Sequence, residues 1–121
     1  MKILTWLVVV MLVTTNLYAM ELKASWYSVE SLKHEGTYAY SHGLMANGNL
    51  FSDKGLTCAT RDFPLGARLK VTNKANHRVV YVVVTDRINK RFKGKRIDLS
   101  MAAFQRIADL DDGVISVIVE R

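Results

Sequence analysis

The stretch of residues 79–85, with the sequence VVYVVVT, limits the fold more than any other part of the chain. β-Branched and aromatic residues favour strands, and a continuous apolar run of this length is typical of a buried strand. Asp86 follows directly. A carboxyl group at the end of a buried strand loses part of its hydration, which favours the protonated form that a general acid needs. The alternative is structural: Asp86 ends the strand, caps a turn and pairs with Arg87.

The first 19 residues have the organisation of a secretory signal peptide. Lys2 precedes an apolar segment, residues 3–13, and Ala19 stands at a suitable cleavage point. The apolar segment is short for a transmembrane helix, although an uncleaved membrane anchor is the alternative. We therefore expect one domain, residues 20–121, in a periplasmic or secreted protein that has no stable membrane insertion after cleavage.

The chain carries a net charge of +6, and removal of residues 1–19 takes away one lysine and no acid, which leaves +5. A basic exported protein suits an anionic partner such as a cell-wall polymer or a membrane surface. The cationic residues cluster only in residues 87–96, so we expect no nucleic-acid partner. Cys58 is the only cysteine, which excludes an internal disulfide. It lies far from the leader, so we expect no lipid anchor and a buried core role.

The remaining pattern predicts many short strands and one helix. Ser100 is a good N-cap, and the stripe Met101, Phe104, Ile107 and Ala108 has helical spacing. The expected strands are residues 23–27, 37–40, 56–59, 67–72, 78–85 and 114–119. This pattern indicates a mainly β fold, either a small barrel or a sandwich.

The histidines His34, His42 and His77 stand at unrelated spacings, so we expect no metal and no cofactor. No serine stands in a recognisable nucleophile turn. The carboxylates are more informative, because Asp86 and Asp98 each lie near the end of an apolar stretch and a basic loop joins them. Two such acids could serve glycoside chemistry. The structural alternative for Asp98 is that it accepts backbone N–H bonds at a strand-to-helix junction.

Several short motifs occur in a consistent order along the chain. They are Ala24-Ser25-Trp26-Tyr27, His42-Gly43, Ala46-Asn47-Gly48, Phe51, Leu56-Thr57, Pro64-Leu65-Gly66, Val71-Thr72-Asn73, Asp86-Arg87 and Arg96-Ile97-Asp98-Leu99-Ser100. Together they resemble the double-psi β-barrel domain of the rare lipoprotein A family, which is related to expansins and barwin-like proteins. The resemblance covers about residues 24–119 and implies a six-stranded double-psi β-barrel with one short helix.

The resemblance also implies an activity. Family members act on bacterial peptidoglycan, several of them as lytic transglycosylases that cleave MurNAc-GlcNAc bonds to 1,6-anhydro products. The family motif Asp-Arg-Gly-Pro aligns with Asp86-Arg87-Ile88-Asn89, in which Asp86 and Arg87 are retained and Gly-Pro is not, and the resemblance places the catalytic acid and base at Asp86. The implied partners are glycan strands, contacted by Tyr27, Asn47, Arg87 and Asp98, and we expect a monomer. Tyr27 has the alternative of a core aromatic role.

One departure from the family pattern affects the mechanism. The family's Thr-Ala-Ala-His-Arg is replaced by Thr57-Cys58-Ala59-Thr60-Arg61, so Thr60 stands where a histidine assists catalysis. A threonine hydroxyl cannot act as a base near neutral pH, although it can position a carboxylate or a sugar. The sequence therefore leaves two functions open: a transglycosylase of altered mechanism, or a non-catalytic, expansin-like polysaccharide-binding module.

A second departure is an extra segment, residues 28–41, which contains His34, Glu35, Tyr38 and Tyr40. We expect it either to line or cover a substrate groove or to form a solvated loop.

Overall fold

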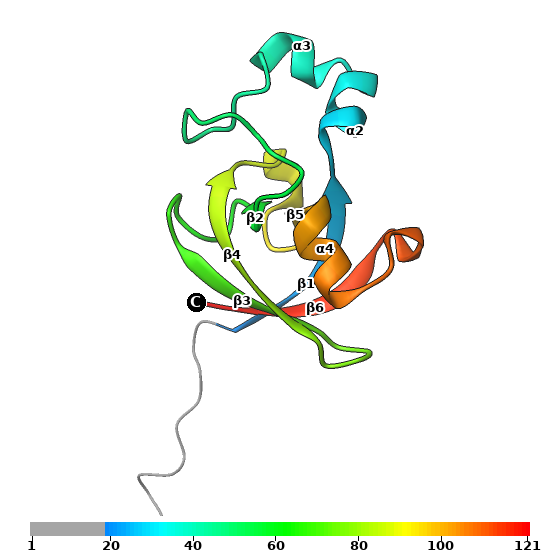
Figure 1. Cartoon of the computed structure of the whole chain (residues 1–121). Helices are drawn as coiled ribbons and strands as arrows, with labels where there is room; N and C mark the ends of the chain where they lie inside the picture. Colours follow the sequence, from blue (N-terminus) through cyan, green and yellow to red (C-terminus); the bar gives the residue numbers. More distant parts are fainter. Residues whose placement is uncertain (1–18) are drawn as a thin grey trace, which may run out of the picture.

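The computed structural model describes residues 19–121, so the predicted signal peptide lies outside the described residues except for Ala19. The fold is mainly β, as predicted, and its six strands close into a barrel in the order β1-β5-β2-β4-β3-β6 (Figure 1). The strands are β1 (Met20–Tyr27), β2 (Thr57–Ala59), β3 (Arg68–Asn73), β4 (Val79–Asp86), β5 (Arg96–Ser100) and β6 (Ile115–Glu120). Every strand pairs on both sides.

Side-chain alternation along the strands builds the core. In β4, Val80, Val82 and Val84 face the barrel interior and are at most 4% exposed. Val79, Tyr81 and Val83 face outward and remain 40%, 50% and 39% exposed. The prediction of a fully buried strand is therefore wrong for one face of β4, because side chains outside a small barrel meet solvent rather than another layer.

The predicted helix is present as α4 (Met101–Ile107). Ser100 caps it by accepting a hydrogen bond from the Ala103 N–H at 3.2 Å. The buried residues of α4 are Ala103, Phe104 and Ile107, and the helix packs against β1, β4 and β5. The short turn η2 (Leu110–Asp112) follows, and Gly113, with a φ of 69°, leads into β6.

The segment of residues 28–41 differs from its prediction. It forms two short helices, α2 (Val29–His34) and α3 (Thr37–Ser41), so the strand expected at residues 37–40 is wrong. A capping box explains α2, because the Ser28 side chain accepts from the Ser31 N–H and the Ser31 hydroxyl accepts from the Ser28 N–H. Both helices lie beyond the arrowhead ends of β1 and β4 (Figure 1).

Strand β5 was not predicted as a separate strand, only as a junction before the helix. It is short, and charged residues occupy its outward positions, Arg96 and Asp98. Ile97 and Leu99 face the core and are completely buried. Tertiary pairing with β1 and β2 forms this strand where its local sequence gives a weak signal.

Cys58 lies in the core with no exposed surface, as predicted. Burial raises the pKa of its thiol to about 12, so the thiolate is not accessible near neutral pH. In residues 19–121, no helix has the length and hydropathy needed to cross a membrane.

Candidate active-site groove

A bulge in β4 determines where the Asp86 side chain points. In the parallel pairing with β2, Cys58 pairs with Val84, and the next residue, Ala59, pairs with Asp86, so Thr85 is an extra residue. Cys58 and Val84 belong to the core cluster, and Ala59 belongs to a separate cluster outside the barrel interior. Strict alternation would place Asp86 on the same face as Val84, but the bulge directs Asp86 outward to the face of Ala59.

Ala59 also pairs with Asp98 of β5, and Asp98 pairs with Ser25 of β1. Ser25, Asp98, Ala59 and Asp86 therefore form one row across four adjacent strands. Two strand spacings place the Cα atoms of Asp86 and Asp98 about 10 Å apart. Between them stands only the methyl group of Ala59, which leaves room for a ligand.

This row forms part of a groove with a volume of about 830 Å³. The segment of residues 28–41 contributes Ser31, Leu32 and Glu35 to its lining, which agrees with the alternative that this segment lines a groove. The segment after β4 contributes Ile88 and Phe92. The groove thus combines carboxylates, hydroxyl groups and apolar side chains, a composition suited to a polar ligand with flat faces.

The Asp86 carboxyl group is held by two backbone donors. Its Oδ1 accepts a hydrogen bond from the Ala46 N–H at 2.9 Å and one from the Arg87 N–H at 2.8 Å. The turn that contains Ala46 is itself bonded to β4, because the Asn47 N–H donates to the Thr85 carbonyl at 3.1 Å. These bonds fix the orientation of the carboxyl group and leave Oδ2 directed at no donor among the described residues.

Asp98 lies in a different environment. It is partly buried, and burial raises its pKa. A hydrogen bond from the Ser25 hydroxyl to Asp98 Oδ1 and the nearby charge of Arg96 offset part of this increase. The two acids of the row thus differ in their donors: backbone N–H groups at Asp86, and a serine hydroxyl at Asp98.

Tyr27 joins the same site. Its side chain is 9% exposed and lines the groove, and its ring stacks on Phe51 with the centroids 4.5 Å apart. Burial, followed by the charges of Asp86, Cys58 and Asp98, raises the pKa of the Tyr27 hydroxyl far above its usual value. The phenol therefore stays neutral, and its oxygen is buried without a hydrogen-bond partner among the described residues, so the O–H can donate to a ligand that reaches it.

Thr60 does not reach the groove lining. It has no exposed surface, and its hydroxyl accepts a hydrogen bond from the Asp62 N–H at 3.1 Å. Its own N–H donates to the Asp86 carbonyl at 3.2 Å. In this structure Thr60 therefore contacts the backbone around Asp86 and not the groove, and the role of its hydroxyl in positioning a carboxylate or a sugar stays a prediction.

Arg87 and Asn47 are also engaged within the chain. Arg87 Nη1 donates to the Thr60 carbonyl at 2.7 Å and to the Phe63 carbonyl at 2.5 Å, so the guanidinium joins the loop after β2 to the end of β4. Arg87 nevertheless lines the groove. Asn47 is exposed, does not line the groove, and accepts the Asn49 N–H on its Oδ1 at 3.0 Å.

Among the groove residues that received no role from the sequence are Arg61, Phe92 and Arg96. Arg61 Nε donates to the Ile88 carbonyl at 2.7 Å. The ring of Phe92 contacts two guanidinium groups, those of Arg91 at 4.6 Å and Arg96 at 4.7 Å from the ring centroid. Phe92 could have been found from the sequence, because it is the single aromatic residue inside the basic stretch of residues 87–96.

Within residues 19–121, no three His, Cys, Asp or Glu side chains lie close enough together to hold a metal ion.

Comparison with known proteins places this geometry in a family. A family model described as "Lytic transglycolase" matches residues 19–119. A relative from Rickettsia felis, "Endolytic peptidoglycan transglycosylase RlpA", is 38% identical over 99 residues, which cover 80% of this chain and 40% of the relative. The chain therefore spans less than half the length of that relative.

Two solved structures share the fold. The Streptomyces papain inhibitor has a TM-score of 0.61 and 24% identity, covering 84% of this chain and 92% of that one. A variant of the Clavibacter michiganensis expansin in complex with cellohexaose has a TM-score of 0.54 and 20% identity, covering 84% of this chain and 48% of that one. The closed six-stranded barrel and the matched residues together show that the chain belongs to the rare lipoprotein A-like family of double-psi β-barrel, lytic transglycolase domains.

Proposed function

We propose that this protein cleaves the glycan strands of peptidoglycan as a lytic transglycosylase, with Asp86 as the catalytic acid and base. The observation that carries the proposal is the position of Asp86. A bulge turns its carboxyl group out of the core into the groove, and two backbone N–H groups orient it there. The name of the Rickettsia felis relative supports peptidoglycan as the substrate.

The proposed reaction needs one carboxyl group in two successive roles. Protonated Asp86 gives its proton to the glycosidic oxygen between MurNAc and GlcNAc, and the bond to C1 of MurNAc breaks. The Asp86 carboxylate then removes the proton of the MurNAc 6-hydroxyl, whose oxygen bonds to C1 and closes the 1,6-anhydro ring. No water is consumed, and Asp86 returns to its protonated form.

The neighbouring side chains take binding and positioning roles in this proposal. Tyr27 and Asp98 hydrogen-bond sugar hydroxyl or N-acetyl groups, a role supported by their position in the groove lining. Thr60 and Arg87 act on the reaction through Asp86, because the Thr60 N–H donates to the Asp86 carbonyl and the Arg87 guanidinium holds the Thr60 carbonyl. Asn47 acts in the same way through its N–H bond to the Thr85 carbonyl. We also propose export under the signal peptide of residues 1–19 to the periplasm or the cell exterior, and action as a monomer.

The test is digestion of purified glycan strands, with the products identified by chromatography and mass spectrometry. The unmodified protein should release products that end in 1,6-anhydro-MurNAc. Asp86→Asn should lower the rate about 10²- to 10⁴-fold, the usual contribution of a general acid or base. Asp111→Asn, an exposed change on η2, is the matched control and should retain the rate. A well-folded unmodified protein that releases no anhydro product would refute the proposal.

A second candidate function is a non-catalytic polysaccharide-binding module. The burial of Thr60 supports it, because the groove then has no side chain at that position to assist proton transfer. The expansin neighbour bound to cellohexaose is a fold-level parallel. Co-sedimentation with insoluble peptidoglycan tests this function: binding without any cleavage would favour the module, and the absence of binding would exclude it.

A further inference from the structure

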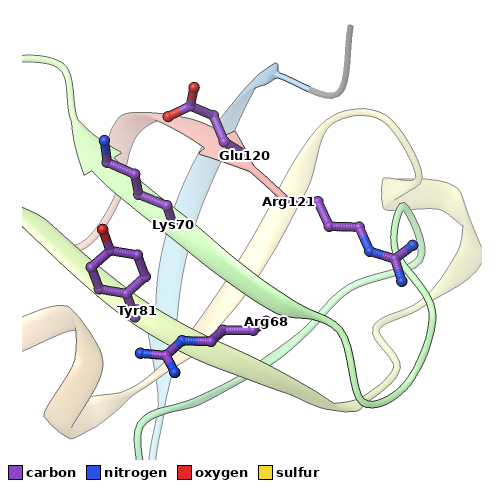
Figure 2. Close-up of a pocket in the computed structure, with 5 residues that line it drawn as sticks. All are labelled: Arg68, Lys70, Tyr81, Glu120 and Arg121. Carbon is purple, nitrogen blue, oxygen red and sulfur yellow. The ribbon is translucent and has the colours of Figure 1, made fainter. Parts of the chain in front are cut away.

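A second pocket lies on the outer surface of the barrel. It has a volume of about 320 Å³ and is lined by residues of β3, β4 and β6 and by Arg121, which follows β6 (Figure 2). The lining residues are Arg68, Lys70, Tyr81, Glu120 and Arg121. None of them lines the groove, so this β3–β4–β6 pocket is a separate site.

Strand pairing preforms the pocket. Tyr81 of β4 pairs with Lys70 of β3, and Lys70 pairs with Glu120 of β6, so these three residues form a row across the sheet. The guanidinium carbon of Arg68 lies 5.2 Å from the centre of the Tyr81 ring. The Tyr81 side chain is still 50% exposed. Figure 2 shows Tyr81 of β4 beside Lys70 and Arg68 of β3.

The chemistry of the pocket selects a class of ligand. Three cationic side chains and one carboxylate give it a positive charge, which attracts anions. A half-exposed aromatic ring offers a flat apolar surface with a polar tip, and arginine binds carboxylates through a fork of N–H donors. A ring compound that carries carboxylates satisfies both features.

The pocket and the groove share one strand. Tyr81 faces outward on β4, and the bulge at Thr85 turns Asp86 outward as well. Asp86 lies five residue steps after Tyr81, and in extended chain these steps span about 17 Å. A polymer held at Tyr81 would therefore keep its neighbouring segments at a high local concentration near the groove.

We propose that the β3–β4–β6 pocket is a second binding surface for a carboxylate-bearing glycan strand, which it holds while the groove acts on the same polymer. The identification of this polymer as peptidoglycan rests on the proposed function. The positive charge of the pocket and its exposed Tyr81 ring are observed independently of that function.

The experiment measures co-sedimentation with purified peptidoglycan sacculi, and with chitin as a neutral polymer of similar sugars. All proteins carry Asp86→Asn, so that cleavage does not alter the polymer. The pocket variants are Arg68→Gln with Lys70→Gln, and separately Tyr81→Thr, which retains a β-branched residue on the strand. The control, Lys54→Gln with Arg78→Gln, removes the same charge from exposed positions outside both sites.

Both pocket variants should bind sacculi about three- to tenfold more weakly than the control, which corresponds to the loss of one or two exposed contacts. The Arg68 and Lys70 double variant should lose more affinity for sacculi than for chitin, and its deficit should shrink as salt is added. Equal binding by the pocket and control variants would overturn the inference. Cleavage of soluble strands by the unmodified protein is measured separately. Cleavage with equal binding by all variants would support the proposed function and refute the pocket, and weaker binding by the pocket variants without cleavage would do the reverse.

Discussion

Asp86 and Asp98 share a single partner, because Ala59 of β2 pairs with Asp86 on one side and with Asp98 on the other. The two carboxyl groups therefore belong to one row, separated by a methyl group. Different donors hold them, backbone N–H groups at Asp86 and the Ser25 hydroxyl at Asp98, so two chemically identical side chains have different environments in one groove.

The first prediction concerns the space above Ala59. Ala59→Val adds two methyl groups between the carboxyl groups and should lower cleavage of glycan strands at least tenfold by excluding the sugar. Overpacking should cost about 1–3 kcal/mol of folding free energy. Steady-state kinetics and denaturant unfolding measure the two effects, with Ala75→Val in the exposed β3–β4 loop as the control. Unchanged kinetics would show that the ligand does not enter between the acids.

The second prediction is a pH dependence of stability. Burial raises the pKa of Asp98 in the folded state, so between the unfolded value of about 3.9 and the raised value the folded protein binds more protons than the unfolded chain. Folding stability should therefore fall as the pH rises through that window. Asp98→Asn should flatten this part of the profile, as measured by thermal unfolding at a series of pH values.

Ser25→Ala provides the complementary change at the same site. It removes a hydrogen bond that holds the pKa of Asp98 down, so the pKa should rise further in an NMR titration. Asp111→Asn serves as the control for the stability profile. Identical slopes for the unmodified protein and Asp98→Asn would contradict the prediction.

The third prediction separates support from catalysis at Thr60. Thr60→Val keeps the shape of the side chain but leaves the Asp62 N–H without its acceptor, which should cost about 1–3 kcal/mol of folding free energy. Thr60→Ser keeps the hydroxyl and should recover most of this loss. Because the side chain does not line the groove, the pH profile of kcat should be the same in both variants. A shifted profile in Thr60→Val would point to a direct role.

The fourth prediction tests the Tyr27 hydroxyl. Tyr27→Phe keeps the ring that stacks on Phe51 and removes only the oxygen. If the hydroxyl binds the sugar, kcat/KM should fall about tenfold, the value of one hydrogen bond, while the unfolding temperature is unchanged or higher. A loss of stability with unchanged kinetics would assign Tyr27 to the core alone.

Much of the fold was predictable from local signals. The valine-rich stretch of β4 and the Ser100-capped helix have strong patterns, and both are present. Strand β5 and helix α3 were not predicted, because β5 depends on pairing with distant strands and residues 37–40 are too few for periodicity to distinguish strand from helix.

The candidate site was predictable only in part. The local pattern identified Asp86 and Asp98, the resemblance added Tyr27, and all three line the groove. The outward direction of Asp86 depends on a bulge, and no local feature of the sequence marks Thr85 as the extra residue. The burial of Thr60 depends equally on packing that only the closed barrel creates.

The closed barrel also affects how the protein behaves in quantity. Each of the six strands has a paired neighbour on both sides along at least part of its length, which leaves little unpaired backbone edge for another copy of the chain. A protein that gathers on an insoluble polymer reaches high local concentrations, where open sheets tend to join edge to edge and form aggregates. Closure of the barrel should therefore lower the tendency of crowded copies of this chain to join edge to edge.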